Sequence, residues 1–452
     1  MTVATPFARR IMGVFATRVV RYAIGFATSF VLARVLGPPG RGAYYLVTLT
    51  PTTLVALAQL GLPSAVSFFA GRGRSGTSLL RVSLLLVVVL SSLLIVATLL
   101  GLPWLEDTVL KAAPGELVRL ALFSLPFQFL ASFVGSALIG RQIMRNYNLI
   151  LVAQSVLMLA LIVLFVGILD LGVLGAVVAN VTTAGAAALA ITVELRRAIR
   201  DDPEESTRPR VRIGELVGYG AKSYPASVAG FFNYRADVFM LSAFLGDPAA
   251  IGLYSLAVSL AELAFFVPDS VSTVFFPRVA GSDRRTADEL APLVSRFTVL
   301  LTGLAVIGLI PVAFAAVYLI IPDFAPSLPA FLIILPGILA LSVSKILSSY
   351  VSGLGLPLRV ALVSSSALGI NLLANLILIP MYGFHGAAAA SLISYTAHAL
   401  MLLVITSRLS RRSPLAYLVP SAVEWQRLRS GVRELRDRRA GGAPPTDPDG
   451  GG

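Results

Sequence analysis

Among the charged side chains inside the long apolar stretches of this sequence, where charge is rare, seven are candidates for function. They are the cations Arg18, Arg21, Arg235 and Lys345 and the acids Asp237, Glu262 and Asp269. A charge at the centre of a bilayer costs about 2.5–3.5 kcal/mol on insertion scales, so each of them needs a partner or a function. Guanidinium and ammonium groups suit phosphate-type anions, and intramembrane carboxylates suit a proton or a cation.

Arg18 and Arg21 lie three residues apart, so on a helix they share a face. At a rise of about 1.5 Å per residue they lie about 22–27 Å from the end of their stretch near Leu36. Two interpretations stay open. The pair could bind a phosphate-type anion, or both side chains could snorkel to the headgroups of the nearer leaflet.

Arg235 lies about 15 Å from the far end of its stretch, near the midplane, where snorkelling is hardest. Asp237 is two residues away and points elsewhere on a regular helix, so the two charges cannot neutralise each other. Glu262 and Asp269 are nearly two helical turns apart and face one way. They are candidates for ion coupling, or they serve as counter-ions to Arg235 and Lys345.

Polar residues recur on one face of two later stretches. They are Ser342, Lys345, Ser349 and Ser352 in one stretch and Ser364, Asn371 and Asn375 in the next. Such stripes predict a water-filled cavity in the second half of the chain, although single Ser or Asn residues are equally typical of helix–helix hydrogen bonds. Pro225 and Pro268 are candidate hinges.

The composition indicates whether these charges lie in a soluble protein or in a membrane. Of the 452 residues, 56% are hydrophobic and only 13% are charged, whereas an average soluble domain has about 25% charged residues. The mean hydropathy is +0.85. So much apolar surface cannot be buried in one soluble core, which predicts an all-α polytopic membrane protein.

Several classes of function are excluded by what the sequence contains. It has no cysteine and only two histidines, His385 and His398, which argues against a metal centre or a disulfide framework. No Walker motif is present, and the predicted outer connections are too short for a catalytic domain, so we expect a protein that is not an enzyme and needs no cofactor. The net charge of +13 lies in short gaps between apolar runs, which indicates a membrane rather than nucleic acid.

Twelve stretches have the roughly 20 apolar residues that a helix needs to cross a bilayer. They lie near Ile11–Leu36, Ala43–Ala70, Leu79–Leu102, Leu117–Ile139, Asn148–Leu169, Val173–Val193, Val217–Leu245, Ile251–Phe276, Leu293–Ile320, Ala330–Leu354, Leu358–Ile379 and Phe384–Thr406. Arginines gather in alternate connections, including Arg72 and Arg74 in the second and Arg208 and Arg210 in the sixth. By the positive-inside rule, both termini are cytoplasmic.

The chain also repeats itself. Leu36-Gly37 recurs as Leu245-Gly246, Leu125-Pro126 recurs as Leu335-Pro336, and Gly172 and Gly175 recur as Gly383 and Gly386, at offsets of 209, 210 and 211 residues. Six stretches separate the members of each pair, and an even number preserves direction. The sequence therefore predicts two parallel six-helix lobes around a central cavity.

The predicted lobes cover residues 1–195 and 215–407, and a polar, arginine-rich cytoplasmic linker over residues 196–214 joins them. A basic cytoplasmic tail follows over residues 408–452. The helical spacing of Trp425, Leu428, Val432 and Leu435 fits either a helix lying on anionic lipid or a short solvated helix. The tail should be disordered over its last residues, which are rich in Pro, Gly and Asp.

Three short motifs resemble those of Wzx-type polysaccharide flippases. They are the run from Leu32 to Gly42, the run from Asn233 to Asp237 that leads to Leu245-Gly246, and the run from Tyr382 to Ala388. The resemblance covers the twelve stretches but not the tail. It implies a protein of the bacterial inner membrane, within the superfamily that also holds multidrug antiporters and lipid II flippases. The lipid II members usually have fourteen helices, which makes that assignment less fitting here.

The resemblance implies alternating-access transport of undecaprenyl-pyrophosphate-linked oligosaccharide repeat units from the inner to the outer leaflet. Membrane lipids and polysaccharide polymerase machinery are the implied partners. A cation-coupled multidrug antiporter of the same superfamily is one alternative, and a non-transporting scaffold of a synthesis complex is another. Charged residues that face a central cavity would count against the scaffold.

The two halves differ in their charges. The first carries Arg18 and Arg21 without an interior acid, whereas the second carries all three acids together with Arg235 and Lys345. Our hypothesis is that the first half grips an anionic headgroup through these arginines. Arg235 and Lys345 are further candidates for the substrate, and Asp237, Glu262 and Asp269 are candidates for sensing a proton or sodium ion.

Overall fold

The computed structural model describes the backbone of residues 4–419, and the side chains of that range except those of residues 4–16, 18, 222, 223 and 225–227. Every regular element in the described range is helical. The α-helices are α1 (Ala4–Ala58), α2 (Leu62–Gly71), α3 (Gly76–Thr108), α4 (Gly115–Leu122), α5 (Leu125–Gly140), α6 (Met144–Ile162), α7 (Gly172–Arg200), α8 (Ile213–Leu245), α9 (Pro248–Glu262), α10 (Phe266–Ala280), α11 (Arg284–Ile320), α12 (Ser327–Gly353) and α13 (Pro357–Ser410). Short helical turns, η1 to η4, cover Val163–Ile168, Leu263–Phe265, Pro322–Phe324 and Pro414–Tyr417.

Within the described range, nine helical segments are long and apolar enough to cross a membrane. Large apolar side chains point outward from them, such as Leu100, which is 80% exposed, and Leu319, which is 81% exposed. In water this surface would drive aggregation, so the fold class predicted from the composition is confirmed. At 33 residues, α8 also has the length of a span. The total of twelve spans stays a prediction.

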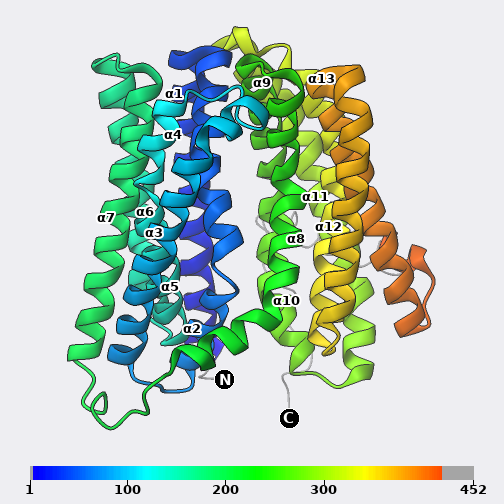
Figure 1. Cartoon of the computed structure of the whole chain (residues 1–452). Helices are drawn as coiled ribbons and strands as arrows, with labels where there is room; N and C mark the ends of the chain where they lie inside the picture. The colour runs from blue at the N-terminus through cyan, green and yellow to red at the C-terminus, as the bar shows by residue number, and fades with distance from the viewer. Residues whose placement is uncertain (1–3, 420–452) are drawn as a thin grey trace, which may run out of the picture.

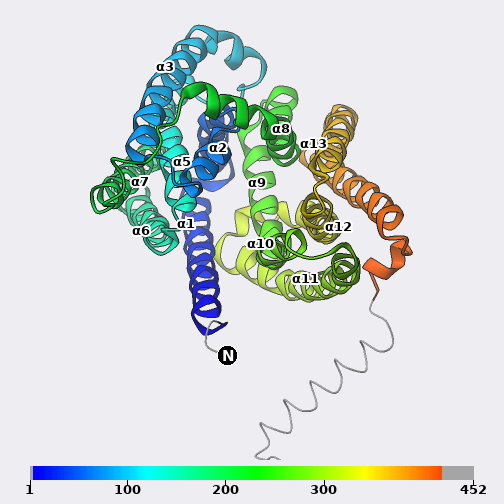
Figure 2. The same ribbon diagram turned by 90° about the horizontal axis from the view of Figure 1, so that it is seen from below.

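The helices form two bundles, with α1–α7 in one and α8–α13 in the other (Figure 1; Figure 2). One hydrophobic cluster includes residues of both bundles, such as Leu46 and Ala179 with Leu241 and Ile338. The second cluster consists of residues of the first bundle and of the start of α8. The third consists of residues of the second bundle and of η4, which follows it. The bundles are therefore fused at one end, called here the seam end, and separate toward the opposite, linker end, where α7 connects to α8.

The repeated glycines all have positive φ, although ψ differs, at −178° for Gly37 and 12° for Gly246. Gly37 has φ of 62° and Gly246 has φ of 61°, while Gly172 and Gly383 have φ of 55° and 58°. Positive φ is readily adopted only by glycine. Gly37 bends α1 into a first arm, residues 4–36, and a second arm, residues 38–58, and Gly383 bends α13 in the same way. The internal repeat seen in the sequence is thus a repeat of glycines at positions of positive φ.

Three predicted stretches are interrupted rather than continuous. The stretch near Ala43–Ala70 breaks where α1 ends and α2 begins, and the stretch near Leu117–Ile139 breaks between α4 and α5. In the stretch near Ile251–Phe276, the turn η2 separates α9 from α10. Pro63 and Pro126 lie in the first turn of the restarted helices, as expected for a residue that lacks the N–H group needed inside a helix.

The connection between α7 and α8 is held against the first bundle. Glu205 accepts hydrogen bonds from the backbone N–H groups of Gly76 and Thr77 at 3.1 and 2.8 Å and lies 2.6 Å from a guanidinium nitrogen of Arg141. The start of α8 follows along α2, where Tyr219 stacks on Phe68 with ring centroids 4.4 Å apart. From there α8 crosses to the second bundle and packs on α13 (Figure 1).

The predicted domain boundaries at residues 195 and 215 stay predictions; in the structure α7 ends at Arg200 and α8 begins at Ile213. At the far end of the chain, α13 ends at Ser410 and η4 follows. There Tyr417 is fully buried, and its hydroxyl lies 2.6 Å from that of Ser410. The predicted lipid-facing helix from Trp425 to Leu435 and the disordered end lie outside the described residues.

Candidate functional site

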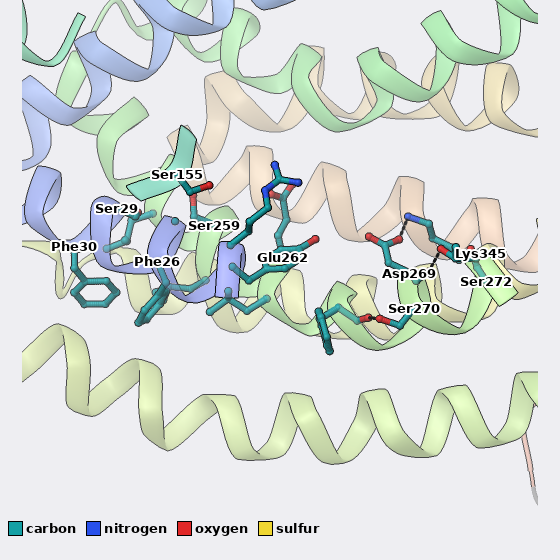
Figure 3. A pocket seen from close by; sticks show the side chains of 18 residues that line it. Phe26, Ser29, Phe30, Ser155, Ser259, Glu262, Asp269, Ser270, Ser272 and Lys345 are labelled. Atoms are coloured by element: carbon teal, nitrogen blue, oxygen red, sulfur yellow. Dashed lines mark hydrogen bonds and ion pairs between the residues drawn. The ribbon is translucent and has the colours of Figure 1, made fainter. Parts of the chain in front are cut away.

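A central cavity lies between the two bundles and consists of two adjacent hollows of about 820 and 560 Å³. Arg21, Gly25 and Ser155 line both hollows, which places the first arm of α1 between them. The larger hollow is bounded by α1 and α6 on one side and by α9, α10 and α12 on the other (Figure 3). The described lining of the smaller hollow belongs to the first bundle except for Arg235, which comes from the second.

Arg21 projects from the first arm of α1 into this cavity. Its Nε atom is buried and has no hydrogen-bond partner, and no carboxylate of the described residues forms an ion pair with it. Arg18 lies one turn earlier on the same helix, but its side chain is outside the described residues. Arg21 is therefore a cation that faces the cavity without a carboxylate partner among the described residues.

Arg235 on α8 is paired with Glu262 at the end of α9. One guanidinium nitrogen lies 3.0 Å from a carboxylate oxygen of Glu262 and the second lies 3.4 Å from the other oxygen. This fork-to-fork geometry is the strongest form of the arginine–carboxylate contact. Both side chains are about one-quarter to one-third exposed, so the pair remains open to the cavity.

Lys345 on α12 forms an ion pair with Asp269 on α10 (Figure 3). The lysine ammonium also lies 5.6 Å from the ring centre of Phe265. Glu262 and Asp269 both line the larger hollow, as their sequence spacing predicted. The structure thus joins each acid to one of the two cations that were named as its possible counter-ions.

Asp237 lies apart from the cavity. It is 2% exposed inside the second bundle and accepts hydrogen bonds from the hydroxyl groups of Tyr254 and Ser391, and from the backbone N–H of Val238. No Lys or Arg of the described residues forms an ion pair with Asp237. The three candidate acids are therefore split between two paired carboxylates in the cavity and one carboxylate sealed within a bundle.

The charge of the cavity follows from these contacts. Its described lining contains three cations, Arg21, Arg235 and Lys345, and two carboxylates, Glu262 and Asp269. The two ion pairs cancel, so one positive charge remains, and it belongs to Arg21. A cavity of low dielectric with one unpaired guanidinium favours an anionic ligand over a cationic one.

The family model described as polysaccharide biosynthesis protein matches residues 8–282, which is more than half of the chain. The chain belongs to this family. The resemblance to polysaccharide flippases drawn from the three sequence motifs is thereby confirmed at the level of the polysaccharide biosynthesis family. No protein of curated function is similar enough in sequence to count as a match.

Solved structures share the fold of this polysaccharide biosynthesis protein. An inward closed structure of the lipid II flippase MurJ has a TM-score of 0.71 at 13% sequence identity, covering 88% of this chain and 89% of that one. An inward-facing multidrug resistance MATE family transporter of the MOP superfamily has a TM-score of 0.67 at 16% identity, covering 87% and 99%. An outward-facing MATE transporter has a TM-score of 0.63 at 16% identity, covering 89% and 95%. These neighbours are transporters and a flippase, not enzymes.

Sequence reasoning missed the uncharged polar lining of this family member. Gln128, Gln154, Asn180 and Thr183 line the smaller hollow, and all four belong to the first bundle. The signal that could have revealed them was present, because each is a polar residue within a predicted apolar stretch. The candidates named from the sequence were the charged residues and the polar stripes of the second half, and these four residues belong to neither group.

The polar stripes of the second half do not line the cavity, apart from Lys345. Asn371 and Asn375 are fully buried on α13, and the side-chain amide of Asn375 donates to the side-chain oxygen of Asn371 at 3.0 Å. Ser394 likewise donates to Asn233 at 2.9 Å across α13 and α8. Of the two interpretations of these stripes, hydrogen bonding within the protein describes Asn371 and Asn375, whereas Lys345 lines the cavity.

Proposed function

We propose that this protein is a flippase that moves undecaprenyl-pyrophosphate-linked oligosaccharide repeat units from the inner to the outer leaflet of a bacterial inner membrane. Arg21 is the observation that supports this most directly, because it is the cation of the described cavity lining that lacks a carboxylate partner. The diphosphate of a lipid-linked cargo matches that requirement in charge and in hydrogen-bond acceptors.

The lining offers separate surfaces for the other parts of such a cargo. Gln128, Gln154 and Asn180 present amide groups that can donate to and accept from sugar hydroxyls. The larger hollow has an apolar wall containing Phe26 and Phe30 of α1, which suits the start of a polyprenyl chain.

A lipid tail must also be able to leave the cavity sideways. At the wall between α1 and α10, the rings of Tyr22 and Phe266 meet edge to face with centroids 5.7 Å apart. We assign this contact as the lateral opening for the tail, because both residues line the larger hollow and one comes from each bundle.

Alternating access requires the cavity to open at one end at a time. Here the bundles are fused at the seam end and separate toward the linker end (Figure 1). With both termini in the cytoplasm, as the distribution of arginine predicts, this conformation receives cargo from the inner leaflet. The outward step then parts the seam, and the flipped repeat unit is passed to the polymerase machinery at the outer leaflet.

The second half of the cavity supplies the coupling in this proposal. Glu262 and Asp269 hold Arg235 and Lys345 in this conformation. Protonation or cation binding at either acid would release its partner and change the charge that faces the cargo. Asp237 is the third candidate, and because it is sealed inside the bundle an ion could reach it only after α8, α9 or α13 shifts.

The two alternatives receive less support. A carrier of cationic drugs needs an unpaired acid in its cavity, whereas both described acids of the lining are already paired. A scaffold has no need to place charges in a cavity between two bundles, yet five charged side chains line this one.

The test is translocation of lipid-linked oligosaccharide in proteoliposomes. Arg21→Gln should lower substrate affinity by roughly 10- to 150-fold, because a hydrogen bond to a charged group contributes about 1.5–3 kcal/mol. Arg359→Gln is the matched control, since Arg359 is exposed and is not part of the lining. Full translocation by the variants Arg21→Gln and Arg18→Gln/Arg21→Gln would refute the proposed role of the cavity.

A further inference from the structure

Three cations of the first bundle reach across the seam to neutral oxygen atoms of the second. Arg34 donates to the carbonyl oxygen of Ile320 at 2.7 Å, and Lys111 donates to that of Ala243 at 3.0 Å. Arg41 donates to the hydroxyl oxygen of Ser259 at 3.4 Å. Among residues 4–419, none of these three forms an ion pair. The closed seam therefore contains positive charge without described counter-ions.

Arg41 is the most deeply placed of the three. It begins the second arm of α1, is only 5% exposed, and has a buried Nη1 atom with no hydrogen-bond partner. The ring of Phe324, whose centre lies 5.7 Å from the guanidinium carbon, makes a cation–π contact that replaces part of the stabilisation an anion would give. A buried guanidinium with one weak hydrogen bond and no anion is unfavourable, so its burial acts against closure of the seam.

The hydrogen-bond partner of Arg41 and the ring beside it both come from the second bundle, since Ser259 lies on α9 and Phe324 lies in η3. When the bundles part at the seam end, as the outward step requires, both groups move away from it. Arg41 then faces the opening, at the same end of the first bundle as Arg34 and Lys111. An anion that binds only the parted state stabilises that state by its differential affinity.

We propose that Arg41 is the centre of a second anion site, which is hidden in this conformation and uncovered when the seam parts. The ligand is a phosphate or diphosphate group, which a guanidinium binds through two parallel hydrogen bonds. This inference rests on the proposed function: in the flippase, Arg41 receives the diphosphate of the cargo on the exit side and favours the outward state. The same chemistry occurs in anionic lipid headgroups, which are the other source of such a ligand.

The test measures the opening of the seam directly. Because the chain contains no cysteine, Val35→Cys and Leu319→Cys introduce two unique spin-label positions, one on each bundle and both exposed. Distances between the labels are measured by electron double resonance in phosphatidylcholine nanodiscs, with inorganic pyrophosphate as the probe. We expect pyrophosphate to increase the long-distance population of the labelled parent by about twofold or more. The variant Arg41→Gln should show no increase, and Arg41→Lys should restore part of it.

A second expectation concerns the ligand-free state. Arg41→Gln removes a buried charge, so its long-distance population should be smaller than that of the parent even before pyrophosphate is added. If this variant and the parent respond equally to pyrophosphate, or if the parent opens neither with pyrophosphate nor in phosphatidylglycerol nanodiscs, the proposal is overturned. Arg359→Gln serves as the control for an exposed arginine and should respond like the parent.

Two further measurements identify the source of the ligand and distinguish the role of Arg41 from that of Arg21. In nanodiscs of phosphatidylglycerol without pyrophosphate, an opening that depends on Arg41 would support the site and assign its ligand to the lipid headgroup. Arg21→Gln should retain the pyrophosphate response, because Arg21 lines the cavity and not the seam. Loss of translocation in Arg21→Gln tests the flippase proposal, whereas the seam response tests Arg41, so either can fail while the other stands.

Discussion

Gly42 and Gly252 lie in one contact between the two bundles, and each touches a backbone carbonyl group of the opposite side. A Cβ atom added to Gly42 would lie 1.8 Å from the carbonyl oxygen of Pro248, and one added to Gly252 would lie 1.9 Å from that of Pro38. Neither distance leaves room for a methyl group. The two glycines therefore allow a close backbone contact across the seam, and each half contributes one of them.

Alanine at this contact should force the seam apart. We expect Gly42→Ala, and separately Gly252→Ala, to move the distance between labels at residues 35 and 319 toward longer values, because backbone atoms cannot give way as a flexible side chain can. Gly308→Ala is the matched control, since nothing lies within 4 Å of the added Cβ atom. Unchanged distances in both seam variants would show that the contact does not hold the conformation.

The Arg235–Glu262 pair should behave as a unit. Arg235→Ala should stop export while the protein still reaches the membrane, and Arg235→Lys should recover little, because lysine lacks the two-pronged geometry seen here. A thermal-unfolding cycle of Arg235→Ala, Glu262→Ala and the double variant should give a coupling of about 0.5–3 kcal/mol. Strictly additive effects would argue that the two residues do not interact in the membrane.

Neutralising the two paired acids should remove ion coupling. The double change Glu262→Gln and Asp269→Asn leaves Arg235 and Lys345 without partners, so the described charge of the lining becomes more positive. We expect substrate binding to be kept and the dependence of translocation on an imposed proton or sodium gradient to be lost. The readout is translocation in proteoliposomes with and without the gradient. A variant that responds as the parent does would identify the acids as structural counter-ions.

The contact of Glu205 with the first bundle should contribute less to stability in acid. Burial raises the pKa of Glu205, but hydrogen bonds from the N–H of Thr77, from Arg141, from Ser75 and from the N–H of Gly76 outweigh it and lower the pKa from 4.5 to about 2. Because the folded pKa is below the unfolded one, this contribution to stability is complete above about pH 4.5 and is lost as the pH falls toward 2.

Glu205→Gln should therefore lower the unfolding temperature at neutral pH and flatten its dependence on pH between 4.5 and 2. The measurement is thermal unfolding in detergent across that pH range. Glu204→Gln is the control from the same connection, because its side chain is 76% exposed and contacts Arg208 only at 3.6 Å. An equal response of the two variants would mean that Glu205 does not hold the linker.

The sequence by itself determined the class of fold and the internal repeat. Apolar stretches of membrane length must become helices, because a backbone in lipid has to satisfy its own hydrogen bonds. Gly37 and Gly246, and Gly172 and Gly383, were visible as a repeat because positive φ is a local requirement that glycine meets at low cost. Helical spacing also placed Glu262 and Asp269 on one face, and both line the cavity.

Only the tertiary structure decided which charges have partners. Arg235 meets Glu262 from another helix, 27 residues along the chain, and no spacing rule connects them. Arg21 and Arg235 looked alike as intramembrane arginines, yet one is paired and the other is free of any described carboxylate. Arg41 looked like a residue of a short connection, and it is buried because that connection packs against α9 and η3, more than 200 residues away. Partners of this kind depend on which helices become neighbours, and the pattern within a single helix does not contain that information.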